Sequence, residues 1–130
     1  MDELEQIKKR KIKELIESKE KMEIEIKATD KDFEEKIIQQ SAKIPIVVDF
    51  WASWCQPCLI LSPTLEKLAK EYKGRFILAK VNIDQASEIS RKYNIMSIPN
   101  VKMFKGGKVV DEFIGAMPEE HVRAWLDKNL

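Results

Sequence analysis

The chain has 130 residues, of which 44% are hydrophobic, enough for one domain with a buried core. Charged residues make up 35%, but 23 Lys and Arg nearly balance 22 Asp and Glu, which leaves a net charge of +1. This balance argues against binding to nucleic acid or to an anionic membrane. The sequence shows no apolar run near the roughly 18 residues of a membrane-spanning helix. Residues 1–21 are charged throughout, unlike a signal peptide, and we therefore expect a cytoplasmic protein.

The first twenty residues predict a helix, because they contain no Gly, Pro or Thr. Their apolar residues fall loosely on one broad face: Leu4, Ile7, Ile12, Leu15 and Ile16. This helix either lies on the domain with a solvated outer face or serves in docking or dimerisation. We favour the first interpretation, since the apolar stripe is too short and irregular for a coiled coil. We expect residues 1–21 to be an extension and residues 22–130 to form the main domain.

From residue 21 onward, strands and helices are predicted to alternate. Period-two alternation over residues 21–27 predicts a short strand. Thr29 or Asp30 is expected to cap a helix that runs through Phe33 to about Ala42. The nearly continuous apolar run Ile44–Ala52 is typical of a strand buried on both faces.

The second half of the chain continues this alternation. A helix is expected from the Cys55 region to Gly74, followed by a buried strand over residues 75–84 and a short helix over 87–93. Two strands within residues 101–115 are joined by a turn at Gly106-Gly107, and Pro118 opens a last helix that ends near residue 129. This order predicts an α/β fold in which helices cover both faces of a central mixed sheet.

The only two cysteines stand three positions apart in the sequence WCQPC. Because a strand ends at Ala52 and a helix follows, Cys55 is expected near a helix N-terminus. There the free N–H groups and the helix dipole favour a thiolate and lower the pKa of the thiol from about 8.5. Pro57 suits the first helical turn, and the i, i+3 spacing brings Cys58 within disulfide reach of Cys55.

Two other roles for the cysteine pair are weaker. A structural zinc ion needs four ligands, and the chain offers one further candidate, the distant His121. A static disulfide that closes so short a loop would add little stability. We therefore favour dithiol–disulfide redox chemistry with no metal at this site.

Four segments together resemble the thioredoxin family: VDFWASWCQPC, AKVNIDQ, SIPNVKMFKGGK and FIGAMPEEHVRAWL. They occur in the family's order, and the match as a whole covers roughly residues 22–130. The resemblance implies the thioredoxin fold and protein-disulfide reductase activity without a cofactor. It also implies disulfide-containing protein substrates and re-reduction of the cysteine pair by thioredoxin reductase. Gln56, Leu59 and Asn100 stand where the family usually has Gly, Lys and Thr, and these differences bear on redox potential and partner choice.

Asp49 is the one charged residue in the apolar run, where an ionised carboxylate is unfavourable without a role or a partner. We expect it to be buried, with a raised pKa, and to accept the proton of Cys58, as the matching residue of the family implies. The alternative is an exposed Asp at the sheet edge. Lys80 matches a buried lysine of the family and is expected to pair with Asp49, or else to extend its ammonium group to the surface.

The family resemblance also implies a cis peptide bond between Ile98 and Pro99, facing the cysteines. The backbone of Ile98 would then be free to pair with an extended substrate segment. Trp54, Ile98, Pro99 and Gly115 are expected to form an apolar rim around Cys55.

We expect a monomeric protein-disulfide oxidoreductase in which Cys55 attacks, Cys58 resolves, and Gln56 and Pro57 tune the potential. The rival hypothesis is a non-catalytic adaptor that docks a partner through the apolar rim or the N-terminal helix.

Overall fold

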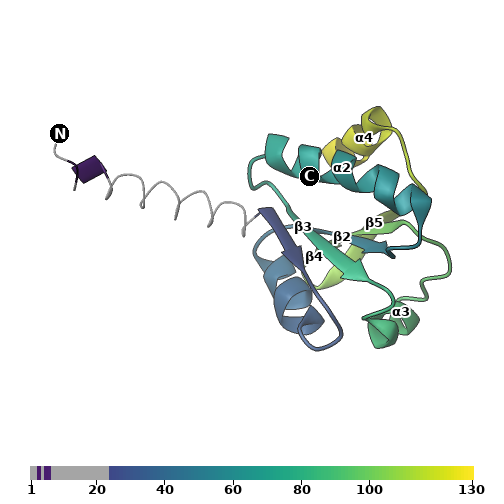
Figure 1. Cartoon of the computed structure of the whole chain (residues 1–130). Coiled ribbons are helices and arrows are strands. Elements are labelled where there is room, and N and C mark those ends of the chain that lie inside the picture. The colour runs from purple at the N-terminus through teal and green to yellow at the C-terminus, as the bar shows by residue number, and fades with distance from the viewer. Residues whose placement is uncertain (1–2, 4, 7–23) are drawn as a thin grey trace.

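The computed structural model describes residues 3, 5–6 and 24–130. Most of the helix predicted over residues 1–21, and the domain boundary after residue 21, lie outside these described residues. A mixed five-stranded sheet lies between two layers of helices (Figure 1). In the described part of the chain, none of the helices combines the length and the apolarity needed to span a membrane.

The central sheet confirms the predicted mixed topology. In spatial order the strands are β1 (Glu25–Lys27), β3 (Ile77–Asn82), β2 (Ile46–Trp51), β4 (Asn100–Lys105) and β5 (Lys108–Ile114). Strands β1, β3 and β2 are parallel, whereas β4 runs antiparallel to β2 and β5 antiparallel to β4. The hairpin between β4 and β5 turns at Gly106 and Gly107, whose φ angles of 59° and 79° suit glycine.

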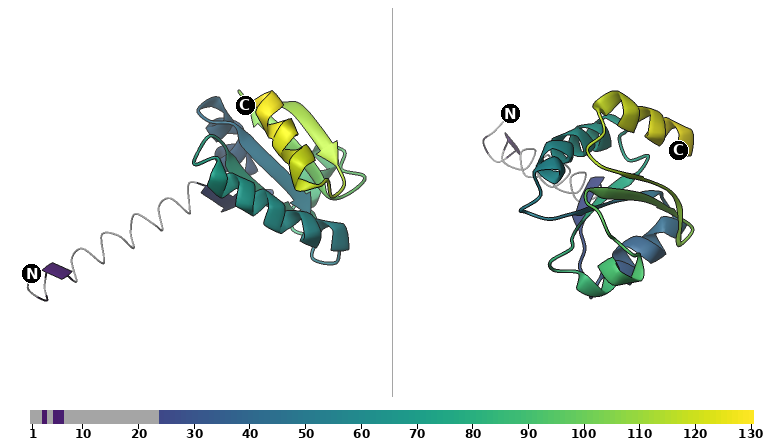
Figure 2. Two further views of the ribbon diagram at one scale, coloured as in Figure 1. Left: turned by 90° about the horizontal axis from the view of Figure 1, so that it is seen from above. Right: turned by 90° about the vertical axis from the view of Figure 1, so that its right-hand side faces the viewer.

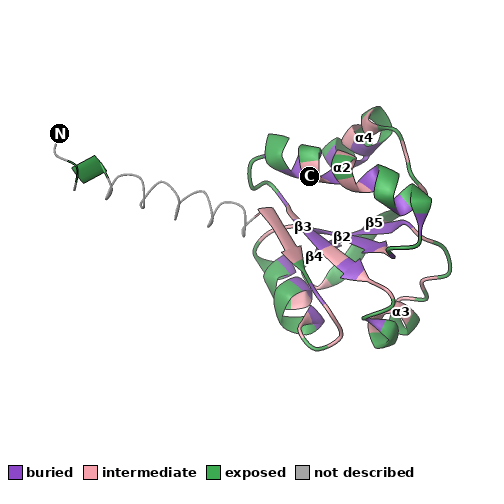
Figure 3. Cartoon of the chain, viewed as in Figure 1, coloured by how far each residue is buried: buried purple, intermediate pink, exposed green. Residues whose placement is uncertain are grey.

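Helices cover both faces of the sheet, as predicted (Figure 2). Helices α2 (Gln56–Glu71) and α4 (Glu119–Asn129) lie on one face. The other face carries α3 (Ser87–Lys92), the π-helix η1 (Glu34–Gln39) and the 3₁₀ turn η2 (Gln40–Ala42). Val47 packs in the cluster with Leu65 and Leu126, and its neighbour Val48 packs in the opposite cluster with Phe33. Strand β2 is therefore buried on both faces, as its apolar run predicts (Figure 3).

The segment between β1 and β2 differs from the prediction. It forms a π-helix and a 3₁₀ turn in place of one capped α-helix, and neither Thr29 nor Asp30 caps it with a side chain. The Asp30 carboxylate instead accepts the N–H groups of Glu88 and Ile89, at 3.3 and 2.9 Å, and so caps α3. At the other end, the Ser41 carbonyl oxygen accepts the N–H of Gly106 and its hydroxyl accepts the N–H of Gly107, both in the β4–β5 turn. Contacts with distant elements therefore fix both ends of this segment, and its local sequence does not reveal them.

Candidate active site

The two cysteines lie where the chain leaves β2 and enters α2. Cys55 is the N-cap of α2, with extended backbone angles, and forms a disulfide with Cys58 across a Cα–Cα distance of 5.3 Å. The N–H of Cys58 donates to the Sγ of Cys55 at 3.2 Å. Since the first N–H groups of a helix have no partner in the helix itself, they stabilise an anion placed there. On reduction, the sulfur of Cys55 is thus in a position that favours a thiolate.

The cysteines are covered unequally. Cys55 is 5% exposed and Cys58 is 1% exposed. Both pack against Ala52, with Trp51 and Ile98 among the partly buried neighbours. Cys55 is therefore the more accessible of the two cysteines.

The loop before β4 faces Cys55. The Ile98–Pro99 peptide bond is cis, as the family resemblance implies, and the Ile98 carbonyl oxygen lies 3.9 Å from the Sγ of Cys55. The N–H of Gly115 donates to the Pro99 carbonyl at 2.8 Å. This bond joins the end of β5 to the loop and brings three of the four expected rim residues together. Pro99 itself is buried, so the exposed part of the rim comes from its neighbours.

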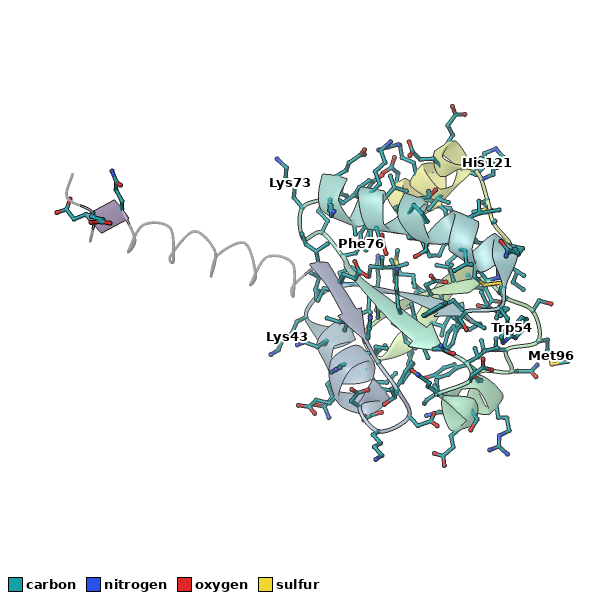
Figure 4. The ribbon with its side chains drawn as sticks, in the orientation of Figure 1. Lys43, Trp54, Lys73, Phe76, Met96 and His121 are labelled. Carbon is teal, nitrogen blue, oxygen red and sulfur yellow. A yellow bond between two sulfur atoms is a disulfide. The ribbon has the colours of Figure 1, made fainter. Side chains whose placement is uncertain are left out.

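Trp54, next to Cys55 in the chain, is an exposed aromatic residue of the expected rim. Its side chain is 65% exposed, and its indole N–H donates to Asp84 at 2.9 Å. Asp84 was not identified from the sequence as part of the site. It lies beside Trp54 because the parallel strands β2 and β3 end next to each other. Met96, 83% exposed, lies at the same end of the molecule as Trp54 (Figure 4). Leu59 on α2 is also exposed.

Asp49 is buried, and its carboxylate has no direct partner among the described residues. It is 1% exposed, and neither oxygen accepts a hydrogen bond there. Burial raises the pKa of Asp49 to about 7; nearby Lys80 partly offsets this effect, and Glu66 adds to it. Since alternate strand residues share a face, Asp49 lies on the same side as Val47, toward α2. The predicted burial and raised pKa are confirmed, and the exposed alternative is excluded.

Lys80 stands opposite Asp49 in the β2–β3 pairing, yet the expected direct pair is not formed. Its ammonium group donates to Ser62 at 2.5 Å and also binds the carboxylate of Glu66, both on α2. Glu25 of β1 lies 3.5 Å from the same ammonium. Lys80 therefore acts on Asp49 through space, while its hydrogen bonds go to other groups.

Sequence reasoning missed Ser62 and Glu66. They follow Cys58 by four and eight positions along α2, which places all three on one side of the helix. This spacing from a reactive cysteine is the signal that could have identified them.

The remaining candidate residues are placed as follows. Gln56 and Pro57 are exposed in the first turn of α2, between the cysteines. His121 is exposed on α4, far from Trp54 (Figure 4). Within the described ranges, no group of His, Cys, Asp or Glu is arranged to hold a metal ion.

A cysteine pair at the start of a helix, with a buried carboxyl group on the preceding strand, is suited to exchanging disulfides with thiols. Together with the mixed sheet and its two helical layers, it defines a thiol–disulfide oxidoreductase. The family model described as thioredoxin matches residues 24–128.

Curated relatives agree with this class. The chain is 44% identical over 103 residues to a thioredoxin of Chlorobaculum thiosulfatiphilum, which covers 79% of this chain and 94% of the relative. It is 42% identical over 105 residues to a thioredoxin of Staphylococcus epidermidis, covering 81% of this chain and 97% of the relative. The chain therefore belongs to the thioredoxin family, and it is a protein-disulfide oxidoreductase.

Proposed function

We propose that Cys55 is the attacking cysteine, that Cys58 resolves the mixed disulfide, and that Asp49 takes the proton of Cys58. The observation that carries this assignment is the N–H of Cys58 directed at the Sγ of Cys55 at the start of α2. That contact stabilises negative charge on one of the two sulfurs only. The greater exposure of Cys55 supports the same order.

The exchange proceeds in two steps. The Cys55 thiolate attacks one sulfur of a substrate disulfide; a Cys55–substrate bond forms, the substrate S–S bond breaks, and the second substrate sulfur leaves as a thiolate. Cys58 then passes its proton to Asp49 and attacks the Cys55 sulfur. The Cys55–Cys58 disulfide forms, and the remaining substrate sulfur leaves as a thiolate. Two electrons have passed from the cysteines to the substrate.

Asp49 suits the role of proton acceptor. Its pKa of about 7 lies closer to that of a thiol than an ordinary carboxyl pKa does, so proton transfer from Cys58 is less unfavourable. Lys80, across the strand pair, tunes this carboxyl electrostatically.

The substrate is proposed to lie across Trp54, Ile98, Pro99 and Gly115. Support comes from the exposed indole of Trp54 and from the Ile98 carbonyl, which faces Cys55 and offers an acceptor to an extended segment. Gln56 and Pro57, between the cysteines, are proposed to tune the redox potential.

Thioredoxin reductase is the proposed electron donor, since family membership supports it. We further propose a monomer that works in the cytoplasm, where reductants keep cysteines available for exchange. Nucleic acid and membrane are not among the proposed partners, because the net charge of +1 gives no general attraction for either.

Trapping experiments test the assignment of the cysteines. Cys58→Ser should accumulate mixed disulfides with cell proteins, because Cys55 still attacks and nothing resolves the product. Cys55→Ser should accumulate almost none. The reverse pattern would show that Cys58 is the nucleophile. The wild-type protein should also accelerate the reduction of a protein disulfide by dithiothreitol, which a non-catalytic adaptor would not do.

A further inference from the structure

We propose that Glu66 is a positioning residue for disulfide exchange: by holding the Lys80 ammonium group on α2, it governs how readily Asp49 takes up and releases a proton. This inference rests on the proposed role of Asp49 as the proton acceptor. Glu66 lies outside the WCQPC sequence, and its described contacts include neither sulfur.

The Lys80 ammonium group donates its hydrogen bonds to groups other than Asp49. A lysine ammonium has three N–H donors. Among the described residues, that of Lys80 donates to Ser62 and Glu66 and lies 3.5 Å from the carboxylate of Glu25. These contacts hold the ammonium group toward α2 and β1, and the carboxylate of Asp49, opposite on β2, receives no hydrogen bond from it.

The carboxylate of Glu66 is fixed from two sides. It binds Lys80, and the hydroxyl of Ser62, one turn earlier on α2, lies 3.4 Å from it. Lys80 in turn holds the pKa of Glu66 below its usual range, so the carboxylate stays ionised at neutral pH. The Glu66 side chain is 38% exposed, whereas that of Lys80 is 11% exposed. The ion pair therefore lies between the buried carboxyl and solvent.

Few ionisable groups face Asp49 from the elements packed around it. Lys80 faces it from β3, and Glu66 acts on it from α2; Glu25 of β1 lies beside the Lys80 ammonium. At Val101 of β4 and Val122 of α4 this side is apolar. The charged residues Lys105 of β4 and Asp111 of β5, on the same side, bind Asn129 at the end of α4.

Lys80 and Glu66 affect Asp49 in opposite directions. The positive charge of Lys80 lowers the pKa of Asp49, and the negative charge of Glu66 raises it. Neutralising Glu66 removes its repulsion and also weakens its hold on Lys80, which can then turn toward Asp49. Both changes favour the ionised form of Asp49. Neutralising Lys80 must do the opposite.

The experiment is a carboxyl ¹³C NMR titration of Asp49 in the oxidised protein, in which neither cysteine titrates. Glu66→Gln keeps the shape of the side chain and removes its charge; it should lower the pKa of Asp49 by about 0.5–1 unit. Lys80→Met should raise it. Glu71→Gln is the matched control, because Glu71 is also on α2 and its side chain is 39% exposed, but it pairs with Arg123. The control should leave the Asp49 titration unchanged.

An unchanged Asp49 titration in Glu66→Gln, or an equal shift in Glu71→Gln, overturns the inference. A second readout separates it from the proposed role of Asp49. The pH profile for release of a substrate from its mixed disulfide should shift to lower pH in Glu66→Gln, together with the titration. If the titration shifts and the release profile does not, the coupling to Glu66 stands and the role of Asp49 as proton acceptor is wrong.

Discussion

Burial of Asp49 should make the stability of the oxidised protein fall as pH rises. In the unfolded chain this carboxyl titrates near 3.8, whereas in the folded protein its pKa is about 7. Between these values the unfolded state has released the proton and the folded state keeps it. The free energy of unfolding should therefore fall by about 1.4 kcal/mol per pH unit across this window. The three or so units between the two pKa values amount to roughly 4 kcal/mol, fully expressed above pH 7.

Asp49→Asn removes this dependence, because an amide does not titrate. The buried amide adds a constant effect of its own, for lack of a partner, but that effect does not change with pH. The measurement is urea unfolding of the oxidised protein and variant at pH 4, 5.5, 7 and 8.5, with the difference in unfolding free energy plotted against pH. The difference should move in favour of the variant by roughly 4 kcal/mol between pH 4 and pH 8.5.

A surface carboxyl with the opposite shift provides the control. Hydrogen bonds from Asn129 and the backbone lower the pKa of Asp111. Its contribution to stability is therefore present above the unfolded pKa and lost as pH falls through the folded pKa. Asp111→Asn should accordingly be destabilising at neutral pH and neutral in acid. A difference between wild type and Asp49→Asn that is flat across pH would refute the reasoning about Asp49.

Three further predictions concern other parts of the chain. Asp30→Ala should destabilise the protein by about 1 kcal/mol in urea unfolding, since α3 loses its cap, whereas an effect below about 0.3 kcal/mol would contradict the capping role. Trp54→Ala should lower kcat/KM several-fold for a protein disulfide but little for a small disulfide, and equal losses would argue against a binding role. Deletion of residues 1–21 should leave dithiothreitol-driven reduction near the full-length rate, because every proposed site residue lies beyond them; loss of reductase-driven activity alone would identify the extension as a docking element.

The sequence by itself was enough to predict the features that depend on neighbouring residues. The apolar run around Val48 predicted a strand buried on both faces, and its single carboxylate, Asp49, stood out because a charge there is unfavourable. The strand–helix junction predicted that Cys55 begins a helix and that Cys58 is within disulfide reach. The cis bond before Pro99 was available only through the family resemblance.

The tertiary structure decided which distant groups meet. Aspartate is a residue type that often caps a helix, and Asp30 precedes one in the sequence. The fold instead places Asp30 against α3, where it accepts the N–H of Glu88, fifty-eight positions further along the chain. Lys80 stands opposite Asp49 and still donates to α2, because Glu66 offers an ionised carboxylate that is partly solvated. Hydrogen-bond partners depend on how strands and helices are placed in space, whereas hydrophobic periodicity and helix-start signals act over a few residues. For this reason the sequence identified the reactive cysteines and the buried carboxyl, and only the packing of α2 on the sheet revealed what controls them.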